Sequence, residues 1–101
     1  MFRITVVDSP LEEKWILQGQ LTGEFSLELS ASWRTSLDRC SDRLRVVDLR
    51  DVTWIDKSGE EVLLKMIREH AQFIATGLYT SHLLEELQTR VMHEETKVDQ
   101  A

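Results

Sequence analysis

The stretch that decides the fold is residues 45–66, RVVDLRDVTWIDKSGEEVLLKM. Its first part, residues 45–49, is a nearly continuous apolar run, which is typical of a central parallel strand buried on both faces. Residues 52–55 continue it in extended form, and from Val62 to His70 apolar residues recur at helical spacing. The stretch therefore predicts a buried strand that passes into a helix near Ser58.

Upstream of this stretch, the sequence predicts two strands and a helix. Residues 4–7 are β-branched, and the turn at residues 8–10 joins them to a second strand at 13–18, so the two form a hairpin. Gly19 and Gly23 bracket a further predicted turn. A helix is expected from about Phe25 to about Cys40, because apolar residues recur every three or four positions along one face. Ser26 and Ser30 fall off that face.

Downstream, a strand is expected at residues 71–76, followed by a last helix that Thr80 or Ser81 caps. From Met92 onward the chain is polar, so we expect a single domain at residues 1–91 and a polar tail at 92–101. The predicted order is strand–strand–helix–strand–helix–strand–helix. Strands separated by helices lie parallel, so the fold class is α/β, with a small mixed, mostly parallel sheet and helices packed on it.

Length and charge narrow the function. The chain has 101 residues and a net charge of −6, which argues against binding to a nucleic-acid backbone. The chain has one cysteine, Cys40, so it cannot form an internal disulfide. We expect Cys40 to be a small buried residue and the protein to be cytoplasmic. The sequence has no signal-peptide pattern and no apolar run of membrane-spanning length.

Ser58 stands at the strand-to-helix junction, and helix capping alone explains a serine there. Glu61 follows three residues later, so residues 58–61 match a capping box, in which Ser58 is the N-cap.

The same region is similar to the STAS domain family, which includes the bacterial anti-sigma-factor antagonists. The similarity rests on the strand pattern at 46–49 and 52–56, on Asp56, Ser58 and Gly59, and on the later Gly77-Leu78 before a helix. It covers roughly residues 4–87. The family motif is Asp-Ser-Ser-Gly followed by Leu-Gly, and its second serine aligns with Ser58.

The chain departs from the family pattern at several positions. Lys57 stands in place of the first serine, and Glu60 and Glu61 in place of Leu-Gly. His70 and Ala71 stand where a glycine often opens the next strand.

The resemblance implies an anti-sigma-factor antagonist that has no catalytic activity and needs no cofactor. Its partner would be an anti-sigma factor with a serine-kinase fold, released when Ser58 is phosphorylated. The implied partner surface comprises Asp56, Lys57, Ser58, Gly59, Glu60 and Glu61, with Gly23 and Glu24 at the same edge of the sheet. Gly23 either needs a positive φ or is an ordinary loop residue.

Two other functions stay open. One is a structural STAS subunit of a lipid-transport ATPase, which the Glu60-Glu61 departure favours. The other is a ligand-sensing module with a nucleotide or lipid at the strand–helix edge. The sequence contains neither a Ser-His-Asp order nor a phosphate-binding loop, so it gives no indication of an enzyme. The spacing of the three histidines does not allow a pair to bind a metal from one helix face. The sequence leaves open whether the protein forms a homodimer.

The remaining unusual residues are interpreted as structural. Trp15, Trp33 and Trp54 lie in strands or in an apolar helical stripe, so we expect them to pack in or near the core. Asp48 interrupts an apolar strand, and a carboxylate there must find hydrogen-bond donors.

Overall fold

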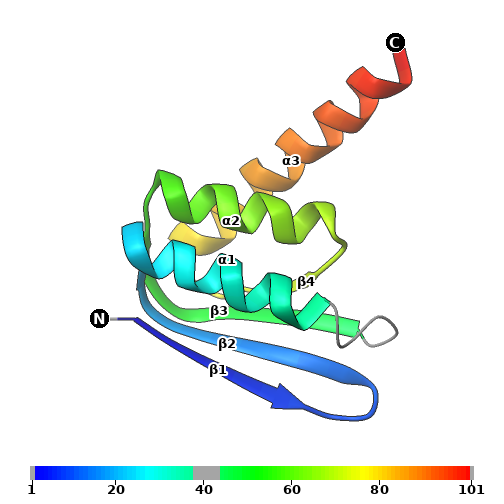
Figure 1. Ribbon diagram of the computed structural model, residues 1–101. Coiled ribbons are helices and arrows are strands. Elements are labelled where there is room, and N and C mark those ends of the chain that lie inside the picture. The colour runs from blue at the N-terminus through cyan, green and yellow to red at the C-terminus, as the bar shows by residue number, and fades with distance from the viewer. Residues whose placement is uncertain (1, 38–43, 101) are drawn as a thin grey trace.

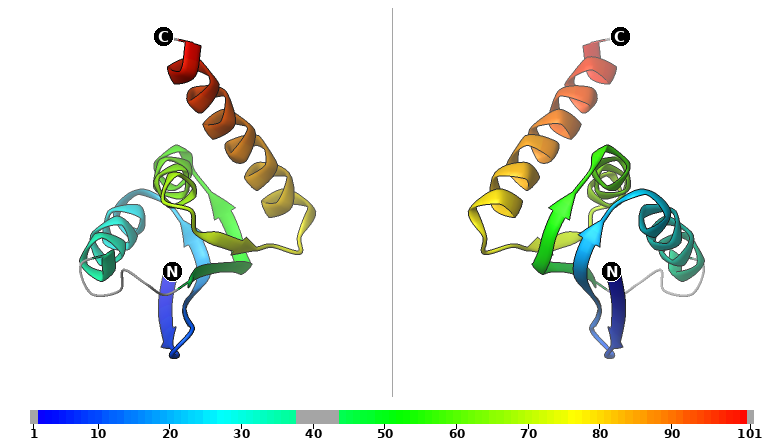
Figure 2. Two further views of the ribbon diagram at one scale, coloured as in Figure 1. Left: turned by 90° about the vertical axis from the view of Figure 1, so that its right-hand side faces the viewer. Right: turned by 90° about the vertical axis from the view of Figure 1, so that its left-hand side faces the viewer.

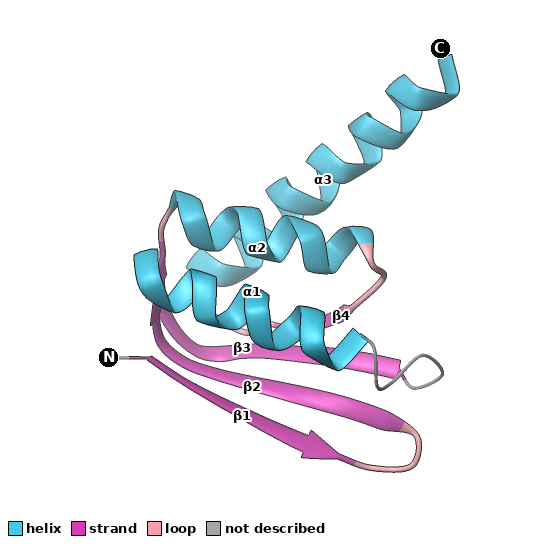
Figure 3. Cartoon of the chain, in the orientation of Figure 1, coloured by secondary structure: helices cyan, strands magenta, loops and turns pink. Residues whose placement is uncertain are grey.

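The structure is a computed structural model that describes residues 2–37 and 44–100, with side chains described for 2–36 and 44–93. Its elements, in chain order, are β1 (Phe2–Asp8), β2 (Glu12–Leu21), α1 (Gly23–Leu37), β3 (Leu44–Ile55), α2 (Lys57–Arg68), β4 (Gln72–Ile74) and α3 (Leu78–Gln100). This is the order that the sequence predicts (Figure 3).

The strands form one mixed sheet in the order β1-β2-β3-β4. β1 pairs with β2 as an antiparallel hairpin, while β3 is parallel to both β2 and β4. The long strand β3 is therefore central, and four successive residues, 46–49, are buried, so both of its faces are covered. This confirms the mixed, mostly parallel sheet and the buried central strand.

The helices α1 and α2 lie side by side, both beginning at the same end of the sheet (Figure 1), and together they cover one of its faces (Figure 2). α3 packs against α2 and brings buried leucines at positions 83, 84 and 87 into the core, while its later turns extend away from the sheet (Figure 1). The core lies between these helices and the sheet, where Leu17, Val47, Leu49 and Leu63 are fully buried. Apolar burial of this kind is the main favourable contribution to folding.

Strand β2 is longer than the sequence suggests. It continues to Leu21, so the turn predicted between Gly19 and Gly23 is wrong. Gly19 has a φ of 103° and lies where the register between β2 and β3 shifts, and glycine tolerates this backbone without a Cβ clash. The strand thus passes the irregularity and reaches the start of α1.

Several predicted boundaries also move. α1 begins two residues before Phe25, and the predicted end of this helix at Cys40 lies outside the described residues. β4 is only three residues long, half of the predicted 71–76. Thr80 and Ser81 do not cap α3, because the helix begins at Leu78, and their hydroxyl groups donate to the carbonyls of Gly77 and Ala75.

The connection from α2 to β4 contains a left-handed residue. α2 ends at Arg68, and His70, which the sequence places on the helix, follows it with a φ of 66°. A non-glycine residue rarely adopts this conformation. Histidine therefore occupies the backbone conformation for which glycine is best suited, at the position where the sequence departs from the STAS pattern.

The described residues include no helix with the length and apolar character that crossing a membrane requires.

Candidate functional site

The carboxylate of Asp56 connects the starts of two helices. It follows β3 directly, has an extended backbone, and is the N-cap of α2. Its Oδ1 accepts a hydrogen bond from the Gly59 amide at 2.9 Å, and its Oδ2 accepts one from the Gly23 amide at 3.1 Å. Because the first amides of a helix have no partners within it, one carboxylate stabilises the N-termini of both α1 and α2.

This geometry decides the two open questions about local structure. Gly23 has a φ of 42°, so the positive φ is present. Asp56, and not Ser58, is the N-cap, so the predicted capping box of Ser58 and Glu61 is wrong. Ser58 is the second residue of α2, and its side chain is exposed. The hydroxyl is therefore free of the capping role and open to solvent at the strand-to-helix junction.

Gly59 brings α2 close to the sheet. A Cβ at this position would lie 2.6 Å from the Leu21 carbonyl oxygen and 2.8 Å from Cγ2 of Ile55. The Leu21 carbonyl also accepts a hydrogen bond from the Asp56 amide at 3.2 Å. Gly59 is thus required for close packing of α2 against β2, and this packing places Ser58 beside α1.

A groove of about 320 Å³ runs between α1 and α2 next to Ser58. Each helix lines it with four residues at positions i, i+3, i+4 and i+7, which is one face of a helix. These residues are Gly23, Ser26, Leu27 and Ser30 from α1, and Ser58, Glu61, Val62 and Lys65 from α2.

The groove brings together only part of the predicted surface. Gly23, Ser58 and Glu61 line it. Asp56 does not line the groove, but it accepts hydrogen bonds from the Gly23 amide and from the amide of the buried Gly59. The exposed residues Glu24 and Lys57 and the half-buried Glu60 lie outside the lining.

Ser26 lines the groove but is not among the residues that the sequence predicts for the site. Its side chain is only 2% exposed, and its hydroxyl oxygen has no hydrogen-bond partner among the described residues. The sequence places it on the polar side of the helix because the neighbouring apolar positions are 25 and 29. The signal that could find it is the spacing 23, 26, 27, 30, which is readable only once α2 is known to lie alongside.

Similar folds are found among solved structures. The anti-sigma factor antagonist SpoIIAA in its unphosphorylated form superposes with a TM-score of 0.65 at 14% identity, over 84% of this chain and 82% of that one. An antisigma-factor antagonist STAS domain from Rhodobacter sphaeroides gives 0.56 at 24% identity, over 77% and 88%. The chain has the STAS-domain fold.

A third match within this fold is an uncharacterized protein of the DUF3478 family from Shewanella loihica PV-4, with a SpoIIAA-like fold. Its TM-score is 0.55 at 18% identity, over 90% of this chain and 75% of that one. No family model matches the sequence, and no curated protein matches it either. The STAS fold is thus established by structure at low sequence identity.

At the opposite end of the STAS sheet, the buried Arg45 of β3 is surrounded by residues from β2, from α1 and from the C-cap of α2. The Arg45 guanidinium lies 3.6 Å from the centre of the Trp33 ring and donates to the Trp33 carbonyl and to Ser36. Its Nε lies 3.8 Å from Glu13 Oε1, and its Nη1 lies 3.9 Å from Glu69 Oε1. The sequence pattern does not reveal this cluster, because its members are far apart in the chain.

Asp48 has the structural role expected of a carboxylate in a buried strand. It accepts three hydrogen bonds from the Arg50 side chain, at 2.7, 3.1 and 3.2 Å, and one from the Arg50 amide at 3.0 Å. The hydrogen bonds from Arg50 hold the pKa of Asp48 below its ordinary value, despite the opposing effect of burial.

The three tryptophans differ in their surroundings. Trp15 and Trp33 are buried and pack edge to face at 5.2 Å, as expected. Trp54 is 53% exposed, so the expectation of core packing is wrong for it. It stacks instead on Tyr79, with ring centres 5.6 Å apart.

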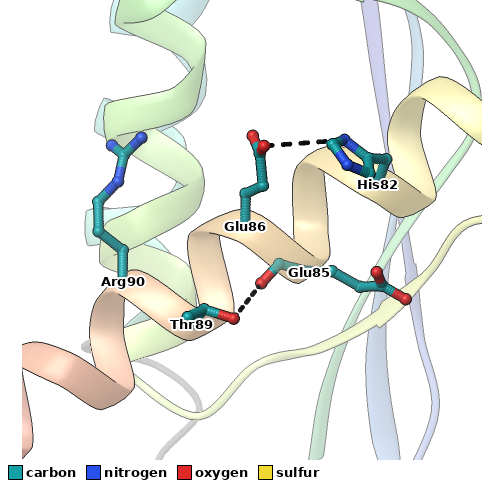
Figure 4. Close-up of a pocket in the computed structure, with 5 residues that line it drawn as sticks. All are labelled: His82, Glu85, Glu86, Thr89 and Arg90. Atoms are coloured by element: carbon teal, nitrogen blue, oxygen red, sulfur yellow. Dashed lines mark hydrogen bonds and ion pairs between the residues drawn. The ribbon is translucent and has the colours of Figure 1, made fainter.

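The surface of α3 carries a second hollow of about 420 Å³. All five residues that line it come from this one helix, and Figure 4 shows Glu86 turned toward His82 while Glu85 and Arg90 point elsewhere. His82 lies 3.9 Å from Glu86, and both side chains are mostly exposed. The two residues therefore lie on a solvent-exposed helix face, and their side chains do not form a binding site together with residues from other elements.

Proposed function

We propose that this chain is a binding module that recognises an anti-sigma factor of the serine-kinase type, and that phosphorylation of Ser58 releases it. The binding surface comprises the first turns of α1 and α2. The observation that carries the proposal is the exposed Ser58 hydroxyl at the second position of α2, within a fold shared with anti-sigma factor antagonists.

The local structure supports such a switch. Ser58 has no capping role, so its modification leaves the Asp56 hydrogen bonds to Gly59 and Gly23 in place. A phosphoryl group adds a charge of about −1.5 to −2. A helix N-terminus accommodates an anion, whereas the same charge within an interface meets repulsion and desolvation. Phosphorylation thus alters binding with little change to the fold.

The test is incubation of the chain with the candidate kinase and ATP, with phosphate located by mass spectrometry. Incorporation at Ser58, absent from Ser58→Ala, is expected. Ser58→Asp should weaken partner binding at least tenfold, equivalent to about 1.4 kcal/mol. The matched control is Ser32→Asp, which introduces the same charge at an exposed serine of α1 outside the groove. No incorporation, or equal effects of the two substitutions, would contradict the proposal.

A second candidate is a structural subunit of a transporter, in which Ser58 stays unmodified. The observation that favours it is Glu61, which lines the groove beside Ser58 and opposes added negative charge there. Affinity purification of the tagged chain distinguishes the two, since recovery of a transport ATPase with unphosphorylated Ser58 supports the subunit and recovery of a serine kinase supports the switch.

A further inference from the structure

The groove between α1 and α2 is lined by serine hydroxyls, and one of them has no hydrogen-bond partner among the described residues. The Ser26 hydroxyl is buried and has no partner among the described residues. A buried hydroxyl in this state costs free energy, so its retention calls for an explanation. Ser30 lines the groove one turn further along α1 and adds a second hydroxyl.

Lys65 provides the positive charge of the groove. Its side chain is exposed, and within the described part of the chain it makes no ion pair. It lies seven residues after Ser58 on the same face of α2, a rise of roughly 10 Å. Long side chains on a helix lean toward its N-terminus. Lys65 therefore contributes its positive charge to the same groove that Ser58 lines.

We propose that the groove is the binding site for the phosphoryl group of phosphorylated Ser58. The inference rests on the proposed function and specifies how the modification acts. A kinase transfers the γ-phosphoryl group of a nucleoside triphosphate to Ser58 Oγ, which loses its proton, and the nucleoside diphosphate leaves. The phosphate oxygens then accept a hydrogen bond from the Ser26 hydroxyl, and the Lys65 ammonium attracts their negative charge along the groove.

The charges around the groove decide how the phosphate lies. Glu61 is the acidic residue within the lining, and Lys65 is the basic one. The other charged side chains near the starts of the two helices are Glu24, Asp56, Lys57 and Glu60. Because the carboxylates repel the phosphate, it is held on the side of Ser26 and Lys65. The phosphate then occupies part of the groove, so a partner loses some of the cavity as well as meeting a new charge.

The first test follows the ionisation of the phosphate in protein with phosphoserine installed at position 58 by chemical ligation. Its second pKa is ordinarily about 6 and can be followed by ³¹P NMR. Removal of a nearby cation raises such a pKa by about one unit, and we expect this for Lys65→Gln. The control is Lys57→Gln, which removes an adjacent cation outside the groove, and an equal or larger shift there would overturn the proposal.

The second test separates phosphate binding from a purely structural role of Ser26. Ser26→Ala removes an unpartnered hydroxyl, so the unphosphorylated variant should be at least as stable as the wild type. In the phosphorylated protein the same substitution removes a charge-assisted hydrogen bond, and the unfolding equilibrium constant should rise about tenfold. An equal effect in both forms would show that Ser26 does not contact the phosphate.

These tests need no kinase, because the phosphoserine is installed chemically. Their failure contradicts the groove as the phosphate site and leaves the kinase experiment unaffected. Absence of a kinase contradicts the proposed switch and leaves the measured phosphate contacts standing.

Discussion

The two ends of the sheet hold their charged groups in different ways. Where β2 and β3 end, the Asp56 carboxylate accepts hydrogen bonds from two backbone amides. The groove beside it is open, and within residues 2–36 and 44–93 the Ser26 hydroxyl has no hydrogen-bond partner. Where β2 and β3 begin, the Arg45 guanidinium is enclosed by Trp33, Glu13 and Glu69. At the first end a buried hydroxyl has no partner among the described residues, while at the second end neighbouring side chains surround the buried charge.

This difference teaches where stability and binding reside. A buried charge with partners on several sides fixes the elements that supply them, and loss of one partner is costly. An open groove with unpartnered donors adds less stability and leaves those donors for a ligand. Substitutions at the closed end should therefore change unfolding most, and substitutions at the open end should change it less.

The largest effect is expected for Arg45→Met. The guanidinium is almost fully buried beside the equally buried Glu13, and its removal takes away the positive charge that lies 3.8 Å from that carboxylate. Loss of one partner of a buried pair lowers the free energy of unfolding by about 3–5 kcal/mol, which urea unfolding measures. Adding Glu13→Gln should restore part of the loss. A change below that of the open-end variants would invalidate the comparison.

The next effect is expected for Gly59→Ala. The new Cβ meets the Leu21 carbonyl oxygen at 2.6 Å, so α2 must move away from β2. Overpacking of this kind costs about 1–3 kcal/mol of unfolding free energy, measurable by thermal unfolding. The matched control is Gly77→Ala, whose Cβ meets only Thr80 Oγ1 at 3.4 Å and should change stability little.

A moderate effect is expected for Asp56→Ala, which removes the hydrogen bonds to Gly59 and Gly23 together. Loss of an N-cap costs about 1–2 kcal/mol. Asp56→Asn sharpens the test, because asparagine is also a good N-cap and the Gly59 bond is retained, while its amide nitrogen replaces Oδ2. If the hydrogen bond from the Gly23 amide contributes, the unfolding free energy of Asp56→Asn, measured by chemical denaturation, should lie between those of the wild type and Asp56→Ala. Equal stability of Asp56→Asn and the wild type would show that this hydrogen bond contributes nothing.

The smallest effect is expected for Asp48→Asn, and it should depend on pH. Hydrogen bonds from Arg50 hold the pKa of Asp48 below its ordinary 3.8, so the carboxylate stabilises the fold above that pH and the contribution is lost as pH falls through the lowered value. Asp48→Asn should lower the unfolding free energy by about 1 kcal/mol at pH 7. The difference in unfolding free energy between wild type and Asp48→Asn should be smaller near pH 2 than at pH 7. An equal difference at both pH values would refute the stabilising role of the Asp48 carboxylate.

The strand-to-helix junction shows what sequence patterns reveal. Residues 46–49 predict a buried central strand because continuous apolar runs require cover on both faces, and the structure confirms it. The capping residue was misplaced by two positions, because Ser58 with Glu61 and Asp56 with Gly59 both fit local rules. Only the position of α1, whose Gly23 amide needs an acceptor, favours Asp56.

Contacts between distant segments were beyond such patterns. Ser26 is buried because α2 lies against α1, and Arg45 is buried because Trp33 and Glu69 cover it. Periodicity describes one helix at a time, so it assigns polar residues to solvent even where a second helix covers them. Trp54 shows the converse, because its aromatic ring remains on the surface, stacked on Tyr79.

Tyr79 satisfies the backbone hydrogen-bonding groups at the end of β3. Its hydroxyl donates to the Ile55 carbonyl at 3.0 Å and accepts from the Ile55 amide at 3.1 Å, so one side chain satisfies both backbone groups there. β4 pairs with β3 only at residues 46–48, far from this point. Unpaired strand edges invite another chain to add a strand and begin aggregation. At Ile55 a phenol from the last helix occupies that place, so α3 closes this end of the β3 edge and also contributes buried side chains to the core.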